Sequence, residues 1–146
     1  MGLFDSFRSA TTPTFNLQQA LMTIVVAAVK ADGEVSRDEV MRIRAMCSLS
    51  PIFASNSGDQ DSAVIDFADN VTSQLRDQAI PKAVQALPLP LRETAFAFAC
   101  DMVLADGVLG SEEERFISAL AQQCSVSDET GKAIIMTTLV RNRTAS

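Results

Sequence analysis

The stretch Leu17–Gly33, LQQALMTIVVAAVKADG, decides the fold of this chain. Up to Lys30 its apolar residues fall on nearly every side of a helix, which predicts a helix packed at the centre of a domain. Asn16 is placed to cap the start of this helix. Asp32-Gly33 ends it, because glycine readily adopts the left-handed conformation that a helix C-terminus often needs.

The same pattern recurs in residues 91–107, LRETAFAFACDMVLADG, where Asp106 stands 74 residues after Asp32. The two stretches align without gaps, and each is followed by the residue spacing of a capping box, which predicts a second helix. These boxes are Ser36 with Glu39 and Ser111 with Glu114. The sequence therefore predicts an internal pseudo-twofold repeat of two helix–Asp-Gly–helix units, with repeat one at about 16–49 and repeat two at about 90–124.

The rest of the chain also predicts helices. Residues 50–61, SPIFASNSGDQD, are typical of a loop, and apolar residues then recur at helical spacing from Val64 to Leu75. Pro81 suits a helix start, and LPLP at residues 87–90 predicts a break before the second central helix. Ser127 is placed to cap a last helix.

No run shows the clean alternation of a strand, and the apolar segments are too long for strands. With 146 residues the chain fits one domain. We therefore expect an all-α fold: a single-domain bundle of about seven helices spanning residues 1–146, with flexible ends at 1–14 and 141–146.

The composition excludes most of the common classes of catalytic site. The chain has no histidine, so Ser-His-Asp and Cys-His catalysis and imidazole zinc sites are excluded. A net charge of −6 opposes binding to nucleic acid. The three cysteines are widely spaced in apolar helical segments, which predicts buried free thiols. With no secretory signal and no apolar run long enough to cross a bilayer, we expect a cytoplasmic protein. The missing histidine leads us to expect that it is not an enzyme.

The motif D-G-x-apolar-x-x-x-E occurs twice, from Asp32 to Glu39 and from Asp106 to Glu113. It matches the second half of a calcium-binding EF-hand loop, which has an oxygen ligand, a turn glycine, a buried apolar residue and a bidentate glutamate. The first half is missing. Its two earlier oxygen ligands are replaced by Ala28 and Lys30 in one copy and by Met102 and Leu104 in the other. Neither copy is therefore a complete EF-hand.

Two interpretations of this motif remain open. Asp-Gly can simply stop one helix while the later acidic residue caps the next, and such a hairpin needs no metal. However, more acidic residues surround both turns than capping requires, and their mutual repulsion favours a cation or a basic partner. These residues are Asp32, Glu34, Asp38 and Glu39 near one turn, and Asp101, Asp106, Glu112, Glu113 and Glu114 near the other.

With both Asp-Gly repeats, the apolar helices before them and the opening MGLFDSFRSA, the sequence resembles the tellurite-resistance TerB family. The resemblance covers nearly the whole chain, and it is strongest at ADGEVSRDE and ADGVLGSEEE. It implies an all-helical bundle of about seven helices with internal pseudo-symmetry, found in bacterial stress and metal-resistance systems. It also implies acidic residues that bind a divalent cation, calcium in particular, and an integral protein partner at the inner membrane.

Carried over by position, the metal-binding residues of the family correspond to Asp32 and Glu39 in the first repeat and to Asp106 and Glu113 in the second. Glu34 has only Val108 opposite it. The supporting acidic face comprises Glu34, Asp38, Glu112 and Glu114.

The leading hypothesis is a noncatalytic cytoplasmic protein, peripheral to the inner membrane, that acts in a tellurite or metal stress response. It would bind Ca²⁺ or another divalent cation weakly, with dissociation constants on the order of 10⁻⁴ to 10⁻³ M, because each site has few protein ligands. The alternative is a metal-independent adaptor that docks a membrane-bound protein partner through the same acidic face. The chain shows no nucleophile motif or phosphate loop, so an enzyme using a carboxylate as acid or base ranks last.

Overall fold

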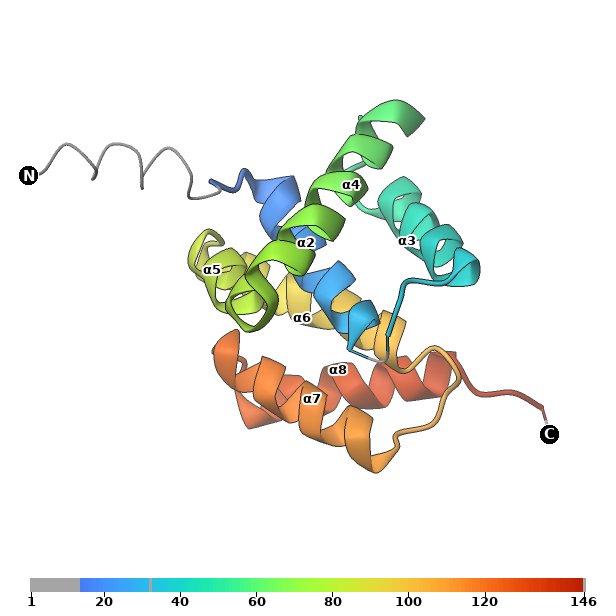
Figure 1. The fold of residues 1–146 in the computed structure, drawn as a ribbon. Coiled ribbons are helices and arrows are strands. Elements are labelled where there is room, and N and C mark those ends of the chain that lie inside the picture. Colours follow the sequence, from blue (N-terminus) through green and yellow to red (C-terminus); the bar gives the residue numbers. More distant parts are fainter. Residues whose placement is uncertain (1–13, 32, 146) are drawn as a thin grey trace, which may run out of the picture.

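The computed structural model describes residues 14–31 and 33–145, and every regular element in these ranges is a helix (Figure 1). The elements are α2 (Leu17–Lys30), α3 (Arg37–Leu49), α4 (Gly58–Leu75), the 3₁₀ helix η1 (Arg76–Gln78), α5 (Ala79–Gln85), α6 (Leu89–Val103), α7 (Ser111–Gln123) and α8 (Asp128–Arg141). The prediction of an all-helical single domain is confirmed. In the same ranges, no helix has both the length and the apolar character needed to cross a membrane. Of the ends predicted to be flexible, residues 1–13 lie outside the described chain.

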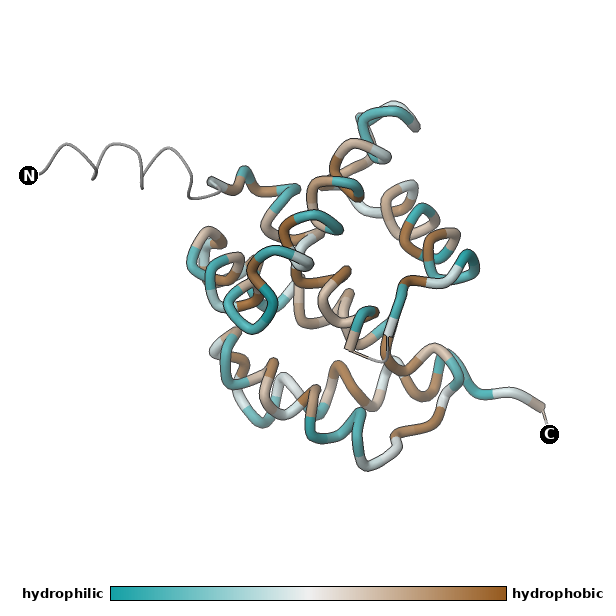
Figure 2. The backbone as a smooth tube through the Cα atoms, viewed as in Figure 1, coloured by the Kyte–Doolittle hydropathy of each residue, from teal (hydrophilic) through white to brown (hydrophobic). Residues whose placement is uncertain are grey.

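Helix α2 is the centre of the fold, as its sequence predicts. It packs against α4, α5 and α6, which surround it in Figure 1. Its buried side chains face several directions around the helix: Ala20, Leu21, Met22, Thr23, Ile24, Val25, Val26, Ala28 and Val29. Figure 2 shows hydrophilic residues at the outer ends of α3 and α4, away from this core. An all-round apolar helix is stable in water only when other helices cover it, and the remaining elements do so.

Most helix starts are stabilised as the sequence indicates. The Asn16 side chain accepts a hydrogen bond from the Gln19 amide at 2.8 Å, and Ser36 accepts one from the Glu39 amide at 3.2 Å. Ser127 is the N-cap of α8. These side chains satisfy amide groups that have no partner within the first helical turn.

The predicted capping box of Ser111 and Glu114 is wrong. Gly110 is the N-cap residue of α7, and Ser111 is the first residue of the helix. The third helical position therefore belongs to Glu113, whose carboxylate folds back over Gly110. A Cβ atom on this glycine would lie 2.5 Å from Glu113 Oε2. The Glu113 carboxylate can occupy this space because glycine has no side chain.

The loop predicted at residues 50–61 is shorter than expected, because α4 already begins at Gly58. Ser57 and Gln60 form a capping box there: the Ser57 amide donates to Gln60 Oε1 at 2.8 Å, and the Gln60 amide donates to Ser57 Oγ at 3.2 Å. Likewise α6 begins at Leu89, within the LPLP segment, because a proline is tolerated in the first turn of a helix.

The three cysteines are buried and free, as predicted. Burial raises the pKa of the Cys47 thiol to about 11, with a smaller contribution from the negative charge of Asp61. It likewise raises the pKa of Cys100 to about 12 and that of Cys124 to about 11. Because the thiolate is the reactive form, these side chains are core residues and poor nucleophiles at neutral pH.

Candidate functional site

The first Asp-Gly turn joins α2 to α3. Asp32, one of the predicted cation ligands, lies outside the described residues. Gly33 has a φ of +129°, which favours glycine, and its amide donates to Lys30 O at 2.9 Å. Beyond the turn, Glu39 Oε1 accepts a hydrogen bond from the Ser36 amide at 2.9 Å. The predicted ligand Glu39 is thus part of the cap of α3.

The second Asp-Gly turn joins α6 to α7. The Gly107 amide donates to Leu104 O at 3.0 Å, and Asp106 Oδ1 accepts from the Val108 amide at 3.0 Å. Gly107 has a φ of +76° and lies against the end of α8, because a Cβ atom here would be only 2.5 Å from Asn142 O. Asp106, one of the predicted ligands, therefore stabilises its own turn through this hydrogen bond to the backbone.

The acidic start of α7 lies beside the end of α2. Glu112 and Glu113 line a small pocket of about 200 Å³ together with Ala31, which follows α2, and with residues of α2, α6 and α7. Ala31 directly precedes Asp32 in the chain. The structure thus brings carboxylates of the second predicted unit next to the helix end of the first.

The remaining predicted acidic residues are more scattered. Asp38 and Glu114 are exposed in the first turns of α3 and α7, respectively. Asp101 forms an ion pair with Arg141 at 3.0 Å, so its carboxylate is already neutralised. Among residues 14–31 and 33–145, no group of three or more Cys, Asp or Glu side chains is placed to hold a metal ion. Within these ranges the predicted ligands Glu39, Asp106 and Glu113 do not form a single cluster.

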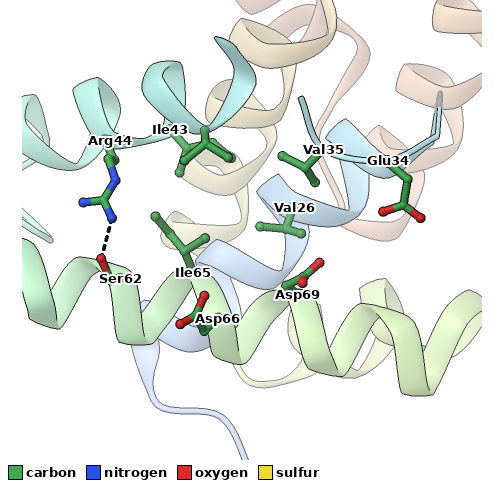
Figure 3. A pocket seen from close by; sticks show the side chains of 10 residues that line it. Val26, Glu34, Val35, Ile43, Arg44, Ser62, Ile65, Asp66 and Asp69 are labelled. Carbon is green, nitrogen blue, oxygen red and sulfur yellow. Dashed lines mark hydrogen bonds between the residues drawn. The ribbon is translucent and has the colours of Figure 1, made fainter. Parts of the chain in front are cut away.

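A larger pocket of about 380 Å³ lies between α2, α3 and α4, next to the first Asp-Gly turn (Figure 3). Its apolar wall is formed by Val26, Val35, Val40, Ile43 and Ile65. Its polar residues are Glu34, Arg44, Ser62, Asp66 and Asp69, and Arg44 donates to Ser62 Oγ.

Asp66 and Asp69 belong to no site predicted from the sequence, but both line this pocket from α4, as Glu34 does from the segment before α3. The available signal was their spacing, because residues three apart on a helix share one face. That spacing gives no information about which other helix the face approaches. The pocket beside the first turn therefore also contains two carboxylates of α4.

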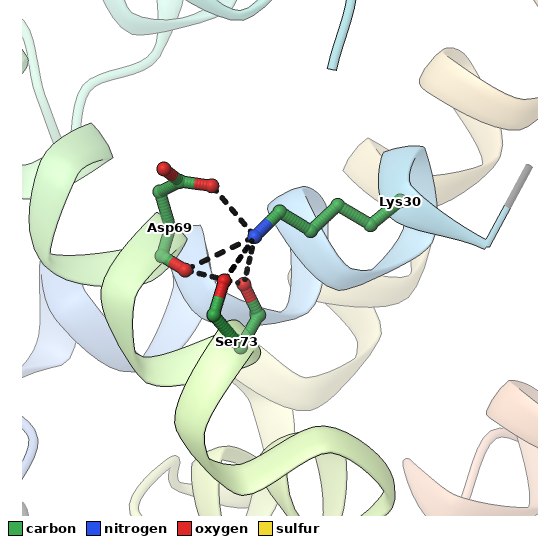
Figure 4. A network of polar contacts seen from close by, with 4 residues as sticks. Lys30, Asp69 and Ser73 are labelled. Atoms are coloured by element: carbon green, nitrogen blue, oxygen red, sulfur yellow. Dashed lines mark hydrogen bonds and ion pairs between the residues drawn. The ribbon is translucent and has the colours of Figure 1, made fainter. Parts of the chain in front are cut away.

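Lys30 stands at a position where an EF-hand has an oxygen ligand, and its side chain binds residues of α4 instead (Figure 4). Its ammonium group lies 2.6 Å from Asp69 Oδ1 and donates to Asp69 O, Thr72 Oγ1 and Ser73 Oγ at 2.9–3.0 Å. The lysine thus ties the end of α2 to α4. A side chain that would be an oxygen ligand in an EF-hand here supplies a cation of its own, surrounded by oxygen atoms.

The available carboxylates can accept more than one interaction each. An ionised carboxylate has about four acceptor positions, so the single amide bonds at Glu39 and Asp106 leave most of them free. Neighbouring carboxylates such as Glu112 and Glu113 repel each other, and a cation or a basic side chain relieves this repulsion. Oxygen coordination of a cation and ion pairing with a basic side chain are the two kinds of interaction that carboxylates of this kind favour.

Comparison with known proteins gives a family for this arrangement. No curated protein and no solved structure matches the chain. A family model described as Tellurite resistance protein TerB matches residues 18–134, which include both Asp-Gly turns and all of α3 to α7. This match confirms the resemblance noted in the sequence. The chain belongs to the tellurite resistance protein TerB family.

Proposed function

We propose that this protein is a noncatalytic adaptor in a tellurite or metal stress response, and that a divalent cation, calcium in particular, controls its choice of partner. The family membership supports the link to tellurite resistance. The observation that carries the cation hypothesis is the pocket shared by Glu112, Glu113 and Ala31, because Asp32 follows Ala31 in the chain. Carboxylate oxygens are the ligands that Ca²⁺ prefers in proteins.

In this proposal Asp32, Glu39, Asp106 and Glu113 supply carboxylate oxygens to one or two ions, and water completes each coordination shell. Few protein ligands per ion mean weak binding, with dissociation constants on the order of 10⁻⁴ to 10⁻³ M. The cap formed by Glu39 and the turn hydrogen bond of Asp106 orient these carboxylates while leaving other acceptor positions free.

We further infer that the two turns arose by internal duplication. Helices α3 and α7 begin at Arg37 and Ser111 and end at Leu49 and Gln123, so both bounds are 74 residues apart, as are the two Asp-Gly pairs. In addition, α3 packs against α6, and residues of α7 line two pockets together with residues at the end of α2. Equivalent positions in the two units support related roles for their carboxylates.

The partner in this proposal is an integral inner-membrane protein with a basic cytoplasmic loop. Exposed carboxylates at Glu34, Asp38, Glu112 and Glu114 attract such a loop, and a bound cation weakens the attraction by neutralising part of the charge. The protein would then work in the cytoplasm at the membrane surface.

Calcium is expected to stabilise the chelator-treated protein. A ligand that binds only the folded state adds RT ln(1 + [L]/Kd), which is about 1–3 kcal/mol at roughly 10 mM calcium for the affinities given above. Urea unfolding with and without calcium measures this difference. The double variant Glu112→Gln/Glu113→Gln should lose most of the effect.

Asp128 and Glu129 provide a matched control, because they too are adjacent acidic residues in the first turn of a helix. The variant Asp128→Asn/Glu129→Gln should keep the full calcium effect. Equal unfolding curves with calcium and with chelator would contradict the cation hypothesis. They would favour the metal-independent adaptor, whose partner binding should weaken with ionic strength and ignore chelators.

A further inference from the structure

A second surface, separate from the Asp-Gly turns, lies between α3 and α6 near the end of α8. It is a groove of about 360 Å³. We call it the α3–α6 groove. Its apolar lining is formed by Ala45, Met46, Leu49, Pro51, Phe98 and Met102. Nothing in the proposed cation chemistry uses these residues.

The apolar lining reaches the protein surface at Leu49, the last residue of α3. This side chain is 85% exposed, the largest exposed fraction among the large apolar residues of the described chain. A single exposed leucine is common on protein surfaces. Here it continues the apolar lining formed by Met46 and Phe98, so a partner that covers Leu49 would bury a continuous apolar strip.

The polar end of the groove carries two guanidinium groups and one carboxylate. Arg141 Nη2 lies 3.0 Å from Asp101 Oδ1, and Arg42 Nη1 donates to the backbone oxygen of Asp101 at a long 3.4 Å. Burial raises the pKa of Asp101, and the two arginines partly offset that effect. When Asp101 is ionised, the residues that line the groove carry two positive charges and one negative charge, in a chain whose net charge is −6.

The second half of the chain carries different side chains at the positions 74 residues later. At the offset of 74 residues, Phe116 takes the place of Arg42 and Gln123 that of Leu49. Both line a corresponding pocket between α7 and α2. The exposed leucine and the arginine are therefore particular to the α3–α6 groove.

We propose that the α3–α6 groove binds the acidic amphipathic helix of a protein partner. Apolar side chains spaced three and four residues apart on that helix would cover Leu49 and enter the groove. A glutamate or aspartate beside them would pair with Arg42 and Arg141, since guanidinium groups bind carboxylates through two parallel hydrogen bonds. The occupant is acidic because the residues that line the groove include two arginines and only one carboxylate.

The test uses a synthetic helical peptide as the probe, with leucines at positions i, i+3, i+4 and i+7 and glutamates at the remaining positions. Amide NMR of the full chain follows the titration at low ionic strength. The expected result is a set of saturable shifts in residues 42–51 and 98–102. The variants Arg42→Glu and Leu49→Ser should each weaken this binding about tenfold or more, because one removes the charge pairing and the other the apolar contact.

Matched controls come from the same helix. Arg37 and Met41 are exposed residues of α3 outside the groove, so Arg37→Glu and Met41→Ser should leave the affinity within about twofold. The amide spectrum of each free variant reports whether its fold is intact.

Three outcomes would overturn the proposal. One is the absence of saturable groove shifts at millimolar peptide, and another is equal peptide affinity for the wild type, Arg42→Glu and Leu49→Ser. The third is a dimer in sedimentation that Leu49→Ser dissociates, because the groove would then hold a second copy of this chain. A peptide carrying lysines in place of the glutamates should shift the groove residues at least about tenfold more weakly.

Discussion

Replacing Phe96 by alanine is expected to lower the free energy of unfolding by about 3–5 kcal/mol, a large share of the stability of a domain. Phe96 is fully buried in α6, which packs directly against the central helix α2. The substitution removes apolar area from the core and leaves a cavity that the surrounding helices can close only in part. Urea unfolding followed by far-ultraviolet circular dichroism measures the loss.

Leu89→Ala is the matched control for this experiment. Leu89 lies on the same helix but is 61% exposed, so its removal should change the free energy of unfolding by less than about 0.5 kcal/mol. Similar losses for the two variants would contradict the packing described for α6.

Gly107→Ala is expected to cost at least about 2 kcal/mol, because the substitution violates two constraints at once. The φ of +76° is unfavourable for alanine, and the new Cβ would lie 2.5 Å from Asn142 O in the backbone after α8. That backbone can move only by disturbing the end of α8, where the Asn142 side chain donates to Leu104 O at 3.2 Å. Thermal unfolding and amide NMR together measure the effect.

The glycine of the first turn offers a direct comparison. Gly33 has a φ of +129°, but a Cβ atom there would meet nothing within 4 Å. Gly33→Ala should therefore show backbone strain of about 1–3 kcal/mol without a remote structural effect. Only Gly107→Ala should shift the amide signals around Asn142. Unchanged signals there would mean that the second turn does not lie against α8.

Hydrophobic periodicity was sufficient to predict most of the helical fold. An all-round apolar helix such as α2 must be central, because no other position buries all its sides. The exact start of each helix depends on its capping residue, and the predictions for α7 and α4 are wrong where that residue is misassigned. At α7, Ser111 resembled a cap, but the glycine before it gave Glu113 room to fold back. At α4, Ser57 and Gln60 have the spacing of a capping box, but both lie within the segment that the composition predicts to be a loop.

The site was predictable only in its local parts. The hydrogen bonds of Glu39 and Asp106 connect residues two or three apart, so the sequence could suggest them as caps and turns. The approach of α7 to α2 and the position of Asp69 beside Lys30 depend on packing between distant segments. Such contacts leave no spacing pattern within one helix, and only the folded chain brings them together.

The most direct test of the cation hypothesis is a calcium and magnesium titration of the chelator-treated protein followed by amide NMR. The hypothesis predicts saturable shifts at residues 32–39 and 106–113, with a dissociation constant on the order of 10⁻⁴ to 10⁻³ M. These shifts should vanish in the double variant Glu39→Gln/Glu113→Gln. Spectra that stay unchanged up to several millimolar cation would contradict the hypothesis and favour a metal-independent interaction surface in which Glu39 caps a helix and Asp106 stabilises a turn.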